Sequence, residues 1–501
     1  MYFRALIPIL LASALAACAT KPAADPVTAS KEPAGPAPGE ERSSRGPAQS
    51  GDDKFALYLK QCRASYADVD ARIAKAGVHD AEYQLVPGFP YVRTDRLMSS
   101  YRRQVSGDIN TLGTWMLQLR ENDSIARDIE LTNMGMPKYE RADLLNTLRT
   151  CAVWLSYGEL ADPPTLERLL DAAKIPEEQP ATQATPAIAG ALAKRRARIV
   201  AQFKEPLAGA ATMPLTLWQV TPPPDDPNLP REFSQTPRDE LGRIGLLMNQ
   251  WPELAASHAP KILLETAADY DRIGSPILTR DGPSVDTDKP VVYYLPSYAR
   301  VGKRTLVQLN YFIWFSASAP QRDGDPEAGA LDGLIWRVTL GDDGAPLLYD
   351  TIGAAGFEHE WFPRSALRPR AGAAEPALIP QAKLPHGDFA IPLSSGTHAL
   401  RRLIALKSAA HAESRRYELR PYEDLMTLAA PEGGTRSLFG PDGVVSGSQR
   451  RGVPALAMRQ WGNHPTSASA RRYFDDPHLI EELFEEPRRA GSVERAGVAG
   501  N

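Results

Sequence analysis

The sequence predicts an α+β fold: an N-terminal helical domain, then a larger β-rich, antiparallel domain that ends in a C-terminal helix. Two observations predict it. Through residues 53–210, apolar side chains recur at three- and four-residue steps, as on the buried face of amphipathic helices. Through residues 211–487, short runs rich in valine, tyrosine, phenylalanine and tryptophan replace that pattern, separated by glycine and proline. We therefore expect two domains that meet near residue 210.

The first expected helix covers residues 55–73, where one face carries Phe55, Leu59, Cys62, Tyr66, Val69 and Ile73. The same periodicity predicts further helices over residues 96–105, 109–125, 141–157 and 166–175. Asp162, followed by two prolines, is typical of the start of the last of these helices.

In the β-rich domain, the clearest signal is a hairpin that pairs residues 334–340 with residues 346–352. Asp343-Gly344 lies between these two apolar runs, and Asp-Gly favours the tight turn of a hairpin. Other strands are expected over residues 214–221, 291–295, 305–315, 400–406 and 417–419. Thr236-Pro237 is expected to open a short helix, and Asp475-Asp476-Pro477 a final helix through Phe484, before a loose tail over 488–501.

Residues 1–17 have the features of a secretory signal peptide, with Arg4 as the only charge before an apolar run over residues 5–15. That run is shorter than the roughly 20 residues that cross a bilayer. The run ends in Leu15-Ala16-Ala17-Cys18, which resembles the lipobox of bacterial lipoproteins. The resemblance implies cleavage before Cys18 and acylation of its thiol; the alternative is an ordinary signal peptide with a chance cysteine.

Residues 18–52 are expected to form a disordered tether, because after the cysteine they are rich in proline, alanine, glycine, serine and glutamate and contain no aromatic residue. Ala19, at the position after the acylated cysteine, favours sorting to the outer membrane by the rule that the lipoprotein resemblance implies. We therefore expect a lipid-anchored protein of the cell envelope, held on the outer membrane and facing the periplasm.

Composition excludes one class of partner and restricts the cysteines. The net charge is −4 and no block of basic residues is present, so nucleic acid is not an expected partner. After Cys18, only Cys62 and Cys151 remain, and in an oxidising periplasm they are expected to form a disulfide. Two separate buried thiols are the alternative. Neither cysteine has a histidine close in sequence, so no metal site is expected.

The common catalytic signatures are absent from the sequence, and no cofactor is expected. The sequence lacks a G-x-S-x-G elbow, a P-loop, a dinucleotide glycine pattern and an EF-hand loop. Residues 359–363 approach a metalloprotease motif, but the second histidine is missing and Pro363 would break the required helix. His359 remains a candidate general base; the alternative is an exposed polar loop at a strand end.

A second candidate site lies near the C-terminus. His464 is a candidate general base that Asp475 could orient. Four residues nearby are candidates for holding an anionic ligand: Arg459, Trp461, Arg471 and Arg472. The alternative is a structural latch, with Asp475 capping the final helix. The aromatic strand over residues 311–315 and Trp336 are expected in the core, with a sugar-stacking face as the alternative.

Four stretches, residues 88–93, 331–338, 349–352 and 458–462, resemble a family of uncharacterised proteobacterial envelope lipoproteins. The resemblance implies no activity. Two functions are therefore compared. The first is a membrane-anchored binding or scaffold module, whose partners are envelope proteins or a cell-wall or glycan ligand. The alternative is an envelope hydrolase or transferase on cell-wall, glycan or lipid substrates, with His464 or His359 as base. The sequence leaves open whether the protein is an enzyme.

Overall fold

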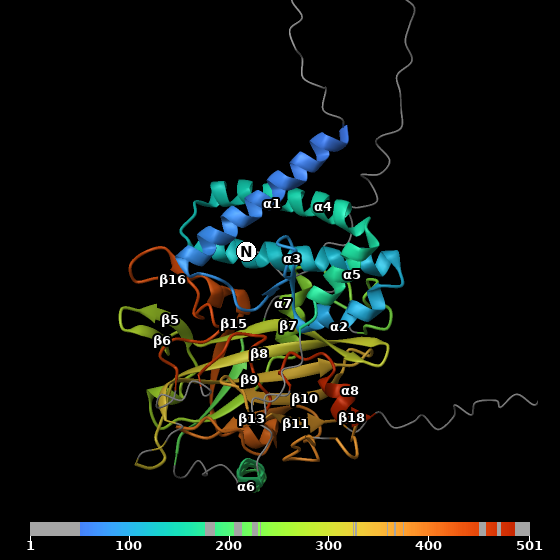
Figure 1. The fold of residues 1–501 in the computed structure, drawn as a ribbon. Helices are drawn as coiled ribbons and strands as arrows, with labels where there is room; N and C mark the ends of the chain where they lie inside the picture. The colour runs from blue at the N-terminus through green and yellow to red at the C-terminus, as the bar shows by residue number, and fades with distance from the viewer. Residues whose placement is uncertain are drawn as a thin grey trace, which may run out of the picture.

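The computed structural model describes residues 51–175, 186–204, 213–222, 229–230, 232–323, 325, 328–357, 359–364, 367–373, 375–449, 457–467 and 472–485. The expected signal peptide, Cys18, nearly all of the tether, and the tail at 488–501 lie outside these residues. The expected α+β class is confirmed: helices precede a large mixed sheet in which antiparallel pairs predominate, and a short helix follows near the C-terminus. In Figure 1, α1, α3 and α4 form a layer at one end of the molecule, and the sheet lies beneath them.

The helical part contains six helices and one short strand pair in the described residues. The helices are α1 (Gly51–Ala76), α2 (Arg96–Val105), α3 (Ile109–Asn133), α4 (Lys138–Leu160), α5 (Pro163–Ala172) and α6 (Pro186–Gln202), and the strands are β1 (Gln84–Leu85) and β2 (Arg93–Thr94). Asp95, Asp108 and Asp162 each accept a hydrogen bond from a first-turn N–H, which fixes where α2, α3 and α5 begin. Figure 1 shows α6 apart from the others, at the far end of the sheet.

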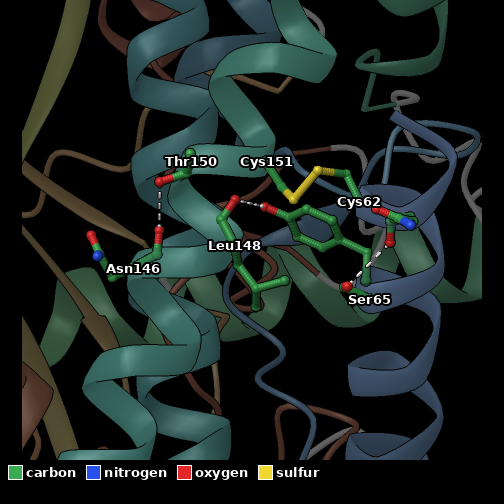
Figure 2. Close-up of a disulfide and its surroundings, with 8 residues drawn as sticks. Cys62, Ser65, Asn146, Leu148, Thr150 and Cys151 are labelled. Atoms are coloured by element: carbon green, nitrogen blue, oxygen red, sulfur yellow. Dashed lines mark hydrogen bonds between the residues drawn. A yellow bond between two sulfur atoms is a disulfide. The ribbon is translucent and has the colours of Figure 1, made fainter. Parts of the chain in front are cut away.

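The expected disulfide between Cys62 and Cys151 is confirmed. It joins α1 to α4, with the two Cα atoms 5.3 Å apart (Figure 2). One turn further along α1, the Tyr66 hydroxyl donates a hydrogen bond of 2.9 Å to the carbonyl oxygen of Leu148 in α4. The disulfide therefore lies within a packed interface between α1 and α4, two helices that are far apart in sequence.

The main sheet has ten strands in the order β11-β10-β9-β8-β7-β15-β3-β4-β13-β14. Its strands are β3 (Leu215–Val220), β4 (Ile262–Glu265), β7 (Val291–Val301), β8 (Arg304–Ser318), β9 (Gly329–Leu340), β10 (Pro346–Gly353), β11 (Glu360–Pro363), β13 (Phe389–Leu393), β14 (Ile404–Ala405) and β15 (Glu413–Pro421). The expected hairpin is confirmed as the antiparallel pair of β9 and β10. Strand β15 runs parallel to both of its neighbours, β7 and β3, and so joins the antiparallel half formed by β7–β11 to a mixed half in which β4 and β13 are also parallel.

Smaller elements surround the sheet. They are α7 (Gln250–Ser257), the hairpin of β5 (Ser275–Thr279) and β6 (Gly282–Asp286), β12 (Arg368–Pro369), β16 (Leu428–Ala429), β17 (Thr435–Arg436), α8 (Leu479–Leu483) and β18 (Phe484–Glu485), with short 3-10 turns at Asp269–Asp271, Leu406–Ala409 and Tyr422–Met426. None of the helices that the structure describes is both long enough and apolar enough to cross a membrane.

Three local predictions are wrong. Thr236-Pro237 does not open a helix: the Pro237 carbonyl accepts the N–H of Gly245 and Arg238 pairs with Ile244, so the segment folds back on itself. The strand expected over residues 400–406 is reduced to β14. Asp475 does not cap the final helix, which starts at Leu479, because its carboxylate is bound by Arg96 of α2.

The sheet buries a core on each face, and the helical part packs against it. The expected core positions of the aromatic strand are confirmed: Tyr311, Trp314, Phe315 and Trp336 are each at most 2% exposed. Tyr101 of α2 joins the two parts, because its hydroxyl lies 2.9 Å from the Thr305 hydroxyl of β8. The side chain of Gln460 likewise donates to Asp80, at 2.6 Å. The C-terminal segment thus contacts both parts of the chain.

Candidate functional site

The C-terminal segment, described over residues 457–467 and 472–485, packs against the end of β9 and β10 and is held there by main-chain hydrogen bonds. The Arg459 N–H donates to the Ala354 carbonyl, the Phe474 N–H donates to the His464 carbonyl, and the Phe357 N–H donates to the Pro465 carbonyl. These bonds bring the two segments that the sequence singled out, around His359 and around His464, into one region of the fold.

His359 belongs to a buried cluster of charges. Arg337 of β9 lies opposite Asp350 of β10 in the antiparallel register, and its Nη2 is 2.5 Å from Asp350 Oδ2. His359 Nε2 is 2.6 Å from the same oxygen. The Arg337 guanidinium also donates to the Phe474 carbonyl and lies 3.7 Å from the centre of the Phe474 ring. This cluster therefore fastens the C-terminal segment to the sheet.

The electrostatics of this cluster favour a structural role. Burial raises the pKa of Asp350, but Arg337 and His359 lower it by a larger amount. The net pKa is below the usual value, so the carboxylate remains ionised. Burial lowers the pKa of His359 despite the nearby carboxylate. Arg337, Asp350 and His359 are at most 7% exposed. A substrate would have to displace the C-terminal segment to reach the imidazole.

The structure does not bring Asp475 to His464 as its orienting carboxylate. Both oxygens of Asp475 lie 2.9 Å from Arg96 Nη1, and Arg96 also stacks at 3.8 Å on the Tyr473 ring. His464 is 1% exposed, and its ring has no hydrogen bond to a side chain among the described residues. Burial lowers the pKa of His464 to about 3, so the ring is neutral and sealed.

The three expected anion-binding residues that the structure describes do not form a common clamp. Trp461 is 8% exposed and packs edge-on against Phe312 and Phe474. Arg472 pairs with Glu482 at 2.8 Å. Arg459 is half-buried, and Arg471 lies outside the described residues. The interpretation of a structural latch, which the sequence left as the alternative, describes this segment better than a ligand clamp.

Sequence reasoning missed a buried ion-pair network in the helical part. Arg93 pairs with Glu130 at 2.8 Å and with Asp123 at 3.3 Å, and Arg127 pairs with Asp123 at 2.9 Å and with Asp70 at 2.7 Å. The signal was present: Asp123, Arg127 and Glu130 recur at helical spacing on the apolar face of α3. Burial opposes ionisation of Glu130, but Arg93 and other donors lower its pKa to about 2.

A second missed group surrounds His398, which has a positive φ of 48°. Its Nδ1 is 2.8 Å from Asp332 and its Nε2 is 3.4 Å from Asp271, and the ring stacks on Phe315 at 3.7 Å. Burial lowers the pKa of His398, but the two carboxylates outweigh it and raise the pKa. These four side chains tie the loop after β13 to the sheet, and no sequence motif marks them.

The candidate binding site is a hollow of about 340 Å³ on one face of the sheet, which we call the sheet hollow. Its aromatic wall is formed by Phe389 and Tyr349, which meet edge-on at 5.1 Å; the Trp336 ring stacks on Tyr349 at 5.6 Å and, at 1% exposure, supports the wall from within the core. Its polar rim contains Lys261 and Arg364 together with His258 and Asp388.

The ionisable side chains of the polar rim differ in their partners and in their exposure to solvent. Lys261 is 2.7 Å from Asp388, whose side chain is 72% exposed, so water screens that pair. Arg364 is exposed and forms a hydrogen bond with Tyr349. Burial lowers the pKa of His258 to about 4, so its imidazole is neutral at physiological pH. The rim can therefore present cationic groups to a ligand beside an aromatic wall.

Comparison of this chain with family models, curated proteins and solved structures found no match in any of the three. Within the part of the chain that the structure describes, no group of three or more histidine, cysteine, aspartate or glutamate side chains is placed to hold a metal ion.

Proposed function

We propose that this protein is an outer-membrane lipoprotein, anchored through Cys18 and facing the periplasm, whose β-rich part binds an anionic cell-wall or glycan ligand in the sheet hollow. The observation that carries the proposal is the composition of the hollow. It combines an aromatic wall with the cationic side chains of Lys261 and Arg364 in a volume of about 340 Å³. Ligand sites typically pair an apolar surface with a few polar groups that fix orientation.

The chemistry of the hollow fits a sugar that carries a carboxylate or phosphate group. Aromatic rings pack against the apolar face of a sugar ring, and an arginine can bind an oxyanion through two parallel N–H donors. Arg364 is exposed, so it can turn toward a ligand at small cost. The sheet positions Trp336 and Tyr349 on adjacent strands, β9 and β10, so the wall is rigid.

The burial of the candidate bases favours binding over hydrolysis. A general base must come within hydrogen-bond reach of the proton that it removes. Asp350 already occupies the Nε2 atom of His359, and His464 is 1% exposed with its pKa lowered to about 3. Neither histidine lines the sheet hollow.

Co-sedimentation with isolated peptidoglycan sacculi tests the binding step. We expect Arg364→Glu to weaken sedimentation of the full-length protein about tenfold or more, because it replaces a cationic donor by an anion at the rim. Phe389→Ala should weaken it as well, by removing part of the aromatic wall. Arg280→Glu, at an exposed turn outside the hollow, is the matched control. Equal sedimentation of Arg364→Glu and Arg280→Glu would remove the hollow from the proposal.

The anchor is tested separately. Labelled palmitate should enter the native protein and not a Cys18→Ser form, and only the native protein should fractionate with outer membranes. Affinity capture from gently solubilised envelopes, compared between these two forms, identifies protein partners that depend on anchoring. Membrane association that survives Cys18→Ser without label would contradict the anchor and leave the binding test unaffected.

A further inference from the structure

A groove with apolar walls lies between α1, α3 and α4, and Asp123 and Arg127 of the buried ion-pair network contribute to its lining. We call it the helical groove. Its volume is about 210 Å³, and its apolar lining consists of Leu117, Leu145, Leu148, Ala152 and Val153. For comparison, an engineered apolar cavity of about 150 Å³ stays dry and binds benzene. The helical groove is therefore large enough to hold a segment of hydrocarbon chain.

Arg120 of α3 also lines this groove, and it has no ion-pair partner among the described residues. Arg120 is half-buried, and this burial lowers the pKa of its guanidinium. Among its neighbours, only Tyr91 and Tyr66 raise that pKa, and they do so by less. Its neighbour Arg127 differs, because Asp123 and Asp70 both pair with it. A partly desolvated cation beside an apolar surface is stabilised by an anion that brings its own apolar chain.

The charge around the groove favours an anion. Its lining contains three arginines against two carboxylates. One carboxylate, Asp123, is already paired with Arg93 and Arg127. The other, Glu121, is exposed to solvent. Arg149 donates to the Ser124 hydroxyl at 2.6 Å and remains without a carboxylate among the described residues.

Exposed aromatic side chains, which we call the aromatic rim, lie on the outer face of α4 and on α1; only their neighbour Val153 lines the groove itself. Val153 of the groove is 51% exposed, Trp154 is 43% exposed and Tyr157 is 71% exposed. The Trp154 ring contacts Phe55 at 5.9 Å and Tyr157 at 6.4 Å. Tryptophan and tyrosine are enriched where proteins meet the headgroup region of a membrane. This rim lies on α1 and α4, and α1 directly follows the segment that carries Cys18.

From these features we infer that the helical groove binds one acyl chain of an anionic phospholipid, with the phosphate at Arg120 and the aromatic rim in the headgroup region. The site would place the helical layer against the membrane surface. It does not depend on ligand binding in the sheet hollow, and its lipid contact is separate from the covalent anchor at Cys18.

Fluorescence quenching by brominated lipids tests this inference in the full-length protein. The protein is reconstituted with vesicles that contain either brominated phosphatidylglycerol or brominated phosphatidylcholine. Trp154 can be followed as the difference between the wild type and Trp154→Phe, because the other seven tryptophans are at most 8% exposed. We expect the anionic lipid to quench Trp154 at a much lower mole fraction than the zwitterionic lipid.

Arg120→Gln should raise the mole fraction of phosphatidylglycerol needed for half-quenching by about tenfold or more, because it removes a charged partner of the phosphate. Arg103→Gln, at an exposed position of α2, is the matched control and should change nothing. Val153→Asp is a second variant whose exposed position preserves folding; its negative charge should also abolish quenching. Circular dichroism verifies that each variant is folded.

Two results would overturn the inference: equal quenching by the two lipids, or half-quenching in Arg120→Gln at the wild-type mole fraction. Flotation of the same samples separates this question from the anchor. Protein that floats while Trp154 is unquenched keeps its anchor and lacks the lipid site. Protein that floats only with the anionic lipid, and only with Arg120 intact, has the lipid site and lacks the anchor.

Discussion

Neutralising Asp350 tests whether the cluster around His359 is structural. The substitution Asp350→Asn keeps the volume of the side chain and removes the charge that compensates Arg337. Arg337 is 1% exposed, and its guanidinium lies 3.0 and 2.5 Å from the two carboxylate oxygens. Removing one partner of a buried ion pair leaves an uncompensated buried charge, which costs about 3–5 kcal/mol of unfolding free energy.

The double substitution Arg337→Met with Asp350→Leu supplies the second half of the test. It removes both charges, and replacing a buried pair by apolar side chains of similar size is often neutral or stabilising. His359 then loses Asp350 as its hydrogen-bond partner and the Phe474 carbonyl loses the Arg337 donor, each at a cost of about 1–3 kcal/mol. Because no uncompensated buried charge remains, we expect the double variant to be at least as stable as Asp350→Asn.

The assay is urea unfolding at pH 7, followed by near-ultraviolet circular dichroism, which reports on the packed aromatic rings. Glu413→Gln is the control, because the Glu413–Arg415 pair is 63% and 43% exposed and should contribute less than about 1 kcal/mol. A loss below about 1 kcal/mol in Asp350→Asn, or a double variant less stable than the single one, would refute the reasoning. The cluster would then be better explained as a functional site.

Three further predictions concern the disulfide and two buried titrating groups. Reduction of the Cys62–Cys151 bond should lower the free energy of unfolding by about 4–5 kcal/mol, from the chain entropy of its long loop, and the Cys62→Ala, Cys151→Ala variant should show the same loss in urea. Burial raises the pKa of Glu360 from 4.5 to about 8, so the folded state keeps a proton that the unfolded chain releases; stability should fall as pH rises through this interval, and Glu360→Gln should flatten that part of the profile. Burial lowers the pKa of His464 from 6.5 to about 3, so the unfolded chain takes up a proton first; stability should fall as pH decreases from 6.5 toward 3, and a His464→Asn profile that keeps the same slope would contradict this.

Local sequence patterns predicted the class of the fold and its local elements. Helical periodicity located α1, α2, α3 and α4, and Asp162 marked the start of α5. The Asp343-Gly344 turn marked the hairpin of β9 and β10. The pairing of Cys62 with Cys151 followed from counting cysteines. Each of these inferences depends on residues that are close in sequence, or on a pairing with a single solution.

The sequence failed where distant segments compete for the same group. Asp475 had the position of a helix cap and became the partner of Arg96, because an arginine of α2, 379 residues away, is brought to it by the packing of the two parts. His359 resembled part of a catalytic motif, and its neighbour across the sheet, Asp350, determined its role. Residues 400–406 had strand character, but only Ile404 and Ala405 form a strand, while Leu400 makes a single bridge to Leu393.

The sequence by itself determined the α+β class, the disulfide and the expectation of a lipid anchor, because short-range periodicity, turn chemistry and composition encode them directly. Only the tertiary structure decided the strand order, the burial of the two histidines, the sheet hollow and the helical groove with its half-buried Arg120. The physical reason is that burial and charge pairing depend on which segments meet in space. The exposure, the partners and the pKa of a side chain therefore depend on its tertiary contacts, which a local sequence pattern does not specify.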